Sequence, residues 1–332
     1  MPNISLNEDI AATKELIYRQ VFSGNTQIEE LPTYPYQKVF PGTNENLCYL
    51  EDHLLDGMKS ALSVLSSGDQ IFTLVYHGIK DISSFDTNRL TYYYSLGIKR
   101  AAILTYDYDE YLNFMENLFS TNFLLDELTA VVKKLFSNME KDCVSFWKEI
   151  LDYNYEIQKG LGTNINLVLM LLKNRHGLTP YNIILPHTET PDAYKKCQNK
   201  LGQANITFEN INCLDLSERI KGRYDVIFLS NIFDYFYQYL GKHWTVDKLL
   251  RFSNGLKNHL NDNGILFLAY IFSLMEFKTY KNPVIDYSAI GISELKMSFN
   301  VTSFPQYEFG SLSNITEDGM VLVRKRSQYK GW

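Results

Sequence analysis

The residues with the clearest chemical pattern surround one tight turn and close the strand that follows it. In the turn, residues 66–69 with the sequence Ser-Ser-Gly-Asp, Gly68 can adopt the positive φ angle that other residues avoid. A helical pattern at 70–77 follows, and Asp86 then ends the expected strand 82–85. This order of turn, helix and strand brings backbone N–H groups and a carboxylate to one place. The carboxylate can accept hydrogen bonds from the 2′- and 3′-hydroxyls of a ribose.

The single glycine of this turn bears on which nucleoside ligand is expected. The dinucleotide fingerprint G-x-G-x-x-G is absent, and the pyrophosphate of NAD or FAD needs the close backbone approach that the additional glycines permit. A ligand with a ribose but no phosphate, such as S-adenosylmethionine, makes weaker demands on the turn. A strand, turn and helix followed by an acid also occur in α/β proteins without a nucleoside site, so a purely structural role stays open.

Composition limits the class of protein. With 332 residues, 45% of them hydrophobic, the chain can form one large domain or one domain with appendages. The 32 basic and 38 acidic residues predict no nucleic-acid partner. The four cysteines are scattered without a C-x-x-C pair, so no metal site is predicted.

The apolar runs and the N-terminal residues bear on the expected compartment. The longest apolar runs, 165–172 and 265–272, are far shorter than the roughly 20 residues of a membrane span. The first residues are acidic and polar, unlike a signal peptide. We therefore expect a cytoplasmic protein with no integral membrane association.

Hydrophobic patterns divide the chain into consecutive parts. We expect an N-terminal helix and flap at 1–60, the first half of a Rossmann-like domain at 61–106, a helical insertion at 107–178, and the second half of that domain at 179–332. Parallel strands are predicted at 61–65, 82–85, 206–211, 224–229 and 265–270, with a turn at 261–264, a helix beginning near residue 88, and a closing strand pair at 299–304 and 319–326.

The segment at 34–46 is aromatic and contains Pro35 and Pro41, which forbid a central strand or a long helix. Because it precedes the first strand, it can reach the carboxyl edge of the sheet. We expect it to act as a flap that folds over a bound ligand.

Several segments, taken in order, resemble a known family. They read Y-P-Y-Q-K-V-F-P-G-T-N-E-N-L at 34–47, S-S-G-D-Q at 66–70, F-D-T-N at 85–88, L-T-Y-D-Y-D-E-Y-L at 104–112 and L-S-N-I-F-D-Y at 229–235. They resemble the bacterial S-adenosylmethionine:diacylglycerol 3-amino-3-carboxypropyl transferase family of betaine-lipid synthesis and its uncharacterised relatives. The family commonly has aspartate where this chain has Asn231. The resemblance implies an α/β fold with a class I methyltransferase sheet, mostly parallel with an antiparallel closing strand.

The resemblance also implies the cofactor, S-adenosylmethionine, and the residues around it. It places the methionine part of the cofactor among Ser66, Ser67, Gly68 and Asp69. It assigns the ribose to Asp86, the neighbourhood of the nucleoside to Asn88 and Leu90, and the adenine to Asp215 and Leu216. The residues implied to face the sulfonium end and the acceptor are Ser230, Asn231, Asp234 and Tyr235. Asp234 or Tyr235 is the candidate catalytic residue.

The expected activity is group transfer, because a sulfonium makes its attached carbons electrophilic and the protein need only position an acceptor. The resemblance favours transfer of the 3-amino-3-carboxypropyl group to a small-molecule or lipid acceptor. Methyl transfer and noncatalytic binding of S-adenosylmethionine are the alternatives. The sequence does not indicate whether the protein is a monomer or an oligomer.

Overall fold

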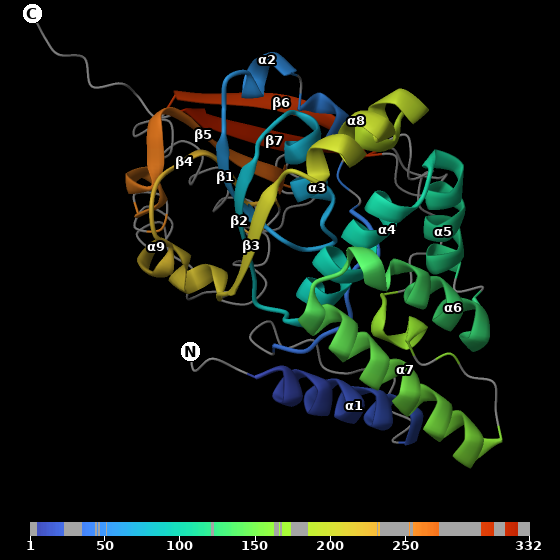
Figure 1. Ribbon diagram of the computed structural model, residues 1–332. Helices are drawn as coiled ribbons and strands as arrows, with labels where there is room; N and C mark the ends of the chain where they lie inside the picture. Colours follow the sequence, from blue (N-terminus) through green and yellow to red (C-terminus); the bar gives the residue numbers. More distant parts are fainter. Residues whose placement is uncertain are drawn as a thin grey trace, which may run out of the picture.

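The protein is built around one seven-stranded sheet whose strand order is β3-β2-β1-β4-β5-β7-β6 (Figure 1). The computed structural model describes residues 5–22, 35–43, 45, 47–50, 52–120, 123–162, 166, 168–173, 185–230, 232, 252, 255–271, 300–308 and 316–324. All statements below concern these residues.

Five strands run parallel to their neighbours. They are β1 (Ser60–Val64), β2 (Asp81–Asp86), β3 (Asn205–Asn210), β4 (Tyr224–Phe228) and β5 (Leu260–Ile271). The prediction of a parallel α/β sheet is confirmed for these strands, whose order is 3-2-1-4-5. Beyond β5, the strand β7 (Thr316–Arg324) pairs antiparallel with β5, and β6 (Asn300–Glu308) pairs antiparallel with β7.

The central strands are apolar on both faces, which is why their sequences read as continuous apolar runs. In β4, Val226 and Phe228 belong to the larger core cluster, whereas Ile227 belongs to the smaller one. Ala61 and Leu62 of β1 divide between the clusters in the same way. Because successive side chains of a strand point to opposite faces, the two clusters lie on opposite sides of the sheet. Helices α3 and α8 cover the side of the larger cluster, and α9 lies on the other (Figure 1).

Most described helices stand on the side of the larger cluster (Figure 1). Their bounds are α1 Leu6–Phe22, α2 Asp52–Leu55, α3 Asp69–Tyr76, α4 Arg100–Thr105, α5 Tyr108–Ser120, α6 Leu125–Leu135, α7 Lys141–Leu161, α8 Pro191–Leu201 and α9 Leu216–Arg219, with short 3₁₀ turns at η1 Leu47–Tyr49, η3 Phe136–Asn138, η4 Leu169–Leu171, η6 Pro186–Thr188 and η7 Cys213–Asp215. Helix α7 shows why these segments are helical, since its buried residues Cys143, Phe146, Trp147, Ile150 and Leu151 repeat at the spacing of one helix face.

The helix expected to begin near residue 88 differs from the prediction. Residues Tyr92–Lys99 form a π-helix, η2, which continues as α4. In a π-helix, residues five positions apart lie over one another, as Tyr94 and Lys99 do here. Both side chains donate to the carbonyl oxygen of Pro41, at 2.8 Å and 3.2 Å respectively. Tertiary contacts with the flap segment therefore accompany a winding that hydrophobic periodicity alone did not predict.

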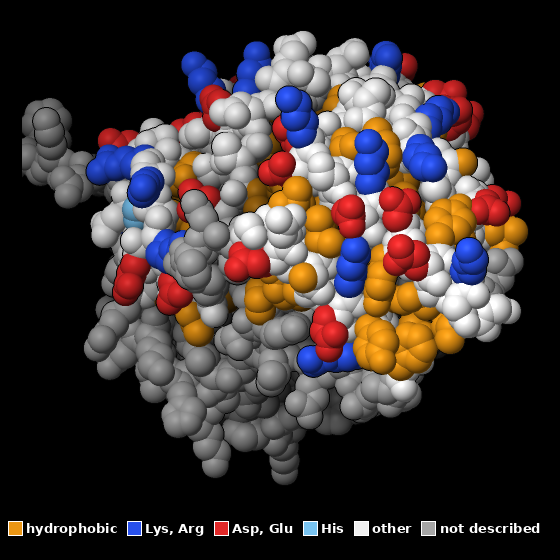
Figure 2. All heavy atoms as spheres, turned by 60° about the horizontal axis from the view of Figure 1, so that its bottom comes forward, with side chains coloured by type: hydrophobic (Ala, Val, Ile, Leu, Met, Phe, Trp, Pro, Cys, Tyr) orange, Lys and Arg blue, Asp and Glu red, His pale blue; other side chains and the backbone are white. Residues whose placement is uncertain are grey.

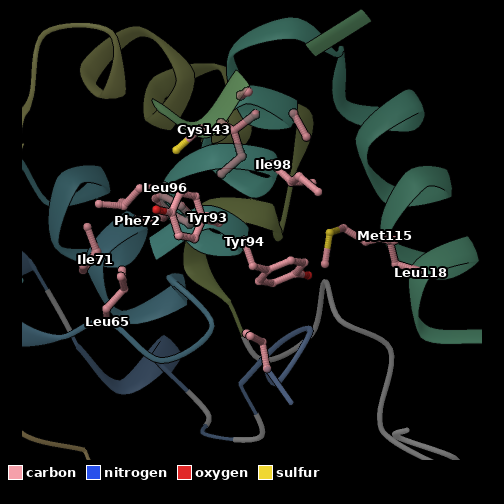
Figure 3. Packing of buried hydrophobic residues seen from close by; sticks show 14 of the residues in the cluster. Leu65, Ile71, Phe72, Tyr93, Tyr94, Leu96, Ile98, Met115, Leu118 and Cys143 are labelled. Carbon is pink, nitrogen blue, oxygen red and sulfur yellow. The ribbon is translucent and has the colours of Figure 1, made fainter. Parts of the chain in front are cut away.

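The core around η2 joins the sheet to the other helices. Figure 3 shows Leu65, Ile71 and Phe72 close to residues of η2, while Met115 and Leu118 of α5 lie on the other side of Tyr94. This packing fixes η2 against the first turn of α3, which is the region where the sequence predicts the ligand site.

The turn predicted at 261–264 lies within a strand. Tyr224 pairs with Leu260 and Val226 pairs with Ile265, so β5 contains extra residues between the two pairs. Asn263 takes a φ of 68° there. The Asn- and Gly-rich sequence accordingly forms an irregularity inside β5, because the apolar residues on both sides of it belong to the same sheet.

Gly68 provides a test of the turn that precedes α3. Its φ is 86°, and an added Cβ would lie 2.8 Å from the Phe72 ring. We expect Gly68→Ala to lower the free energy of unfolding by about 3 kcal/mol or more, since left-handed strain and overpacking add. Gly57→Ala is the matched control, because Gly57 has a φ of 76° with nothing near the added Cβ, and its cost should be about 1–2 kcal/mol. Equal losses in urea unfolding would contradict the packing argument.

Candidate functional site

The carboxyl ends of the parallel strands bring the predicted residues to one edge of the sheet. Val64 of β1 pairs with Phe85 of β2, and Asp86 pairs with Asn210 of β3. On the other side of β1, Ser63 pairs with Phe228 of β4. The glycine turn (residues 66–69), Asp86, the loop after β3 and Ser230 therefore follow adjacent strand ends. In open α/β sheets, this edge is where ligands bind.

Asp86 is held at this edge by main-chain hydrogen bonds. One carboxylate oxygen accepts from Ser66 N at 2.9 Å, and the other accepts from Asn88 N at 2.8 Å. Ser66 has a φ of 44°, so the turn bends its N–H toward the carboxylate. Burial raises the pKa of Asp86 to about 6, although hydrogen bonds from the backbone of Asn88 and Ser66 oppose the rise. These two hydrogen bonds hold the Asp86 carboxylate in one position at the edge where the sequence predicts the ribose.

Asp69 has a different environment from the one that the resemblance implies. Its side chain is fully buried, and one oxygen lies 2.6 Å from Lys99 Nζ. The other oxygen accepts from Ser67 Oγ at 2.8 Å and from Thr43 N at 2.7 Å. Asp69 thus stabilises the turn and the flap segment from inside, whereas the resemblance places it around the methionine part of the cofactor.

Lys99 completes this buried ion pair. Its Nζ also donates to Ser67 O at 3.0 Å and to Pro41 O. The π-helix, the glycine turn and the flap segment are therefore joined through one ammonium group and one carboxylate. A buried charge pair requires such additional hydrogen bonds to offset the loss of hydration.

The flap segment, described at 35–43 and 45, reaches the carboxyl edge as expected. Arg89 N donates to Pro35 O at 2.7 Å, and the Asn88 amide exchanges two hydrogen bonds with the backbone of Gln37. On its other side, Val39 pairs with Leu172 in a parallel bridge. These contacts fix the flap segment between the loop after Asp86 and Leu172. Whether ligand protects it further remains a prediction.

Helix α1 contributes a buried carboxylate that the sequence reasoning missed. Asp9 is fully buried and accepts hydrogen bonds from Tyr36 Oη at 2.7 Å and from Tyr93 Oη at 2.6 Å, and it forms a salt bridge with Arg89. The sequence feature that could have revealed Asp9 is its position, because Asp9, Thr13 and Leu16 repeat at the spacing of one helix face and are buried in α1. This cluster connects α1 to the loop that follows Asp86.

The residues implied to contact the nucleoside base separate into two groups. The Asp215 side chain is exposed after β3 and makes no capping hydrogen bond to α9. Leu90 and Leu216, in contrast, are buried in the two core clusters. Cys213, between β3 and Asp215, lies within electrostatic range of Asp86: burial raises the pKa of its thiol to about 12, and the Asp86 charge adds to the rise. The loop after β3 therefore flanks the Asp86 carboxylate.

At the end of β4, the structure adds a second carboxylate that was not predicted. Ser230 has a φ of 55° and donates through Oγ to Glu45 Oε1. Glu45 is 2% exposed and comes from the flap segment, where no periodic pattern marked it. Asn231, Asp234 and Tyr235 lie outside the described residues.

His187 is a buried histidine to which the sequence assigned no role. Its Nδ1 lies 3.2 Å from Thr73 Oγ1, and its Nε2 has no hydrogen-bond partner among the described residues. Burial lowers its pKa to about 4. It packs beneath α3, edge-on to Phe72, on the core side of the glycine turn.

No group of metal-type ligands occurs within the described ranges. Over the same residues, no helix is both long and apolar enough to cross a bilayer. On the side of α1 and α7, which Figure 2 turns toward the reader, acidic and basic side chains are interspersed.

Comparison with other proteins gives a structural likeness only. No protein-family model matches the chain, and no curated protein matches it. Among solved structures, the N-methyltransferase NodS from Bradyrhizobium japonicum is similar at TM-score 0.40 and 8% identity, over 83% of this chain and 92% of that one. An O-methyltransferase from Bacillus cereus in complex with SAH is similar at TM-score 0.35 and 9% identity, over 95% and 91%. A methyltransferase from Pyrococcus furiosus is similar at TM-score 0.35 and 10% identity, over 96% and 99%.

The sheet itself carries the structural conclusion. Its five parallel strands follow the order 3-2-1-4-5, which is that of a Rossmann-like α/β fold. The narrower resemblance to the aminocarboxypropyl transferases has no matching family model.

The buried ion pair at the turn can be tested by its removal in two steps. Lys99→Met leaves the Asp69 carboxylate buried without its ammonium partner, and we expect a loss of about 3–5 kcal/mol in the free energy of unfolding. Adding Asp69→Asn should recover part of this loss, since the unpaired charge disappears.

A surface pair supplies the control for this experiment. Lys14 and Glu149 lie 2.9 Å apart with side chains 31% and 55% exposed, so Lys14→Met should cost less than about 1 kcal/mol. Urea denaturation of the variants makes the comparison. A Lys99→Met protein as stable as the wild type would show that the pair does not hold the turn.

Proposed function

We propose that this protein is an S-adenosylmethionine-dependent transferase. The observation that carries the proposal is the hydrogen bond from Ser66 N to the Asp86 carboxylate, which joins the glycine turn after β1 to the acid that ends β2. In this arrangement a ribose can bind to Asp86 while the rest of the ligand extends across the turn. The methyltransferase-like strand order supports the same cofactor.

The start of α3 favours a ligand without phosphates. A pyrophosphate binds at a helix N-terminus, where backbone N–H groups and the helix dipole attract negative charge. Here the Asp69 carboxylate at the start of α3 is paired with the Lys99 ammonium and bonded to Thr43 of the flap segment, so this helix end is already occupied by groups of the protein. The backbone at Gly68 is also closed in by Phe72 and Ser95, which leaves less room than the several glycines of a dinucleotide turn provide.

We further propose that the transferred group is 3-amino-3-carboxypropyl, on the strength of the sequence resemblance. A nucleophile of the acceptor attacks the methylene carbon bonded to the sulfonium, and the carbon–sulfur bond breaks with its electron pair passing to sulfur. The product is 5′-methylthioadenosine, and the acceptor loses a proton. Asp234 or Tyr235 is proposed to orient or deprotonate the acceptor, a small molecule or a lipid.

The product identifies the reaction. We expect purified protein incubated with S-adenosylmethionine and pools of small-molecule and lipid acceptors to release 5′-methylthioadenosine, as measured by chromatography of the nucleosides. S-Adenosylhomocysteine as the sole product would establish methyl transfer instead. If calorimetry detects binding of S-adenosylmethionine but no acceptor pool gives turnover, a noncatalytic binding protein is favoured. Binding of NADH without binding of S-adenosylmethionine would overturn the assignment of the cofactor.

The raised pKa of Asp86 predicts a pH dependence of ligand binding. Because the pKa is raised to about 6, the carboxyl group is protonated below that pH and loses acceptor capacity for the ribose hydroxyls. The affinity for 5′-methylthioadenosine, which carries no amino acid part, should be constant above about pH 7 and fall toward tenfold per pH unit below the pKa. Calorimetry from pH 5 to pH 8 measures this change.

Asp86→Asn is the control for this titration. The variant should bind at least tenfold more weakly at pH 8, because charge-assisted hydrogen bonds are stronger than neutral ones. It should also lose the pH dependence. A wild-type affinity that stays flat across this range would show that the ribose does not bind to this carboxylate.

A further inference from the structure

A cluster of polar side chains lies at the topological switch point of the sheet. In the order 3-2-1-4-5, the chain leaves β1 toward β2 on one side, whereas β4 lies on the other side. The crevice between β1 and β4 is therefore the expected ligand position. Gln70 lies in the first turn of α3, which follows β1, and Ser230 follows β4, so the two residues come from the two strands that flank this position.

Glu45 connects these two sides. Its Oε1 accepts from Ser230 Oγ, and its Oε2 accepts from Gln70 Nε2 at 3.1 Å. Its own N–H donates to Thr43 Oγ1 at 3.1 Å, and Gln70 Nε2 also reaches Thr43 Oγ1 at 3.3 Å. The carboxylate is thus fixed between two strand ends by side chains from two other segments, helix α3 and the residues after β4.

Gln70 adds an independent observation that points to a ligand. Its side chain is 1% exposed, and its Oε1 has no hydrogen-bond partner among the described residues. The donor of the same amide binds Glu45, so the unsatisfied acceptor lies beside the carboxylate. A buried acceptor without a partner is costly, and a ligand donor at this place would remove the cost.

We propose that Glu45, together with Gln70, binds the α-ammonium group of the cofactor's amino acid part. This inference rests on the proposed function. With the ribose at Asp86 after β2, the amino acid end extends past the turn after β1 toward β4. Neighbouring strands lie about 4.8 Å apart, so the β1–β4 crevice is roughly 7 Å from the end of β2, a distance that the aliphatic chain of the cofactor spans. An ammonium group carries three donors, which suits a carboxylate and an amide oxygen together.

The charge of the ligand separates this role from the alternatives. S-Adenosylmethionine carries an ammonium, a sulfonium and an α-carboxylate, S-adenosylhomocysteine carries the ammonium and the carboxylate, and 5′-methylthioadenosine carries none of these charges. A residue that binds the ammonium therefore discriminates between the last two ligands. A residue that merely supports the fold of the site affects all three.

Calorimetry of the Glu45→Gln variant with these three ligands is the test. We expect the affinities for S-adenosylmethionine and S-adenosylhomocysteine to fall at least tenfold, and the affinity for 5′-methylthioadenosine to stay within about twofold of the wild type. Glu209→Gln is the control, because Glu209 is an exposed carboxylate on β3 whose loss changes the net charge equally. It should leave all three affinities unchanged.

Each other result has a distinct meaning. Unchanged binding of S-adenosylhomocysteine to Glu45→Gln, or an equal loss for all three ligands, overturns the ammonium site while leaving the cofactor assignment intact. A wild-type protein that binds none of the three ligands overturns the proposed function itself. If thermal melting shows that Glu45→Gln does not fold, Gln70→Met replaces it, with the same ligand discrimination expected.

Discussion

The buried ion pair between Asp69 and Lys99 is the interaction on which the candidate site depends. Both side chains are fully buried, and the pair joins the first residue of α3 to the last residue of the π-helix. The same two groups bind Pro41 and Thr43 of the flap segment. In a low-dielectric interior an isolated charge is strongly destabilising, so neither group can move without the other. The pair therefore keeps three segments in a fixed relation.

The N-terminal part of the chain belongs to the site in physical terms. Helix α1 and the flap segment are far from β1 in sequence, yet Asp9 binds Arg89 and the Gln37 backbone binds Asn88. Arg89 and Asn88 both lie in the loop that immediately follows Asp86. They explain why the loop after β2, which would otherwise be free to move, presents Asp86 in one orientation.

The two sides of the carboxyl edge are built differently. Around Asp86, which is half-buried, main-chain N–H groups of Ser66 and Asn88 set the geometry. At the β1–β4 crevice, side chains of Glu45, Gln70 and Ser230 are bonded to one another and buried. Main-chain N–H groups hold the carboxylate in a position that suits a neutral ligand part, such as the proposed ribose. A network of side chains suits a charged end that must be desolvated.

The sequence by itself determined the elements that depend on local pattern. The apolar run of β4, the glycine of the turn and the acid that ends β2 are all local features, because burial on both faces and a positive φ restrict the residue types directly. Tertiary structure alone decided the roles of Asp69, Glu45 and Asp9, since a carboxylate looks the same in sequence whether it faces a ligand or a buried lysine. It also decided the π-helix at Tyr92–Lys99, where contacts with Pro41 outweigh the usual helical period. Lys99, the partner of Asp69, and Ser230, the partner of Glu45, lie on segments that only the folded chain brings together. No local sequence pattern indicates which distant residue will be the partner.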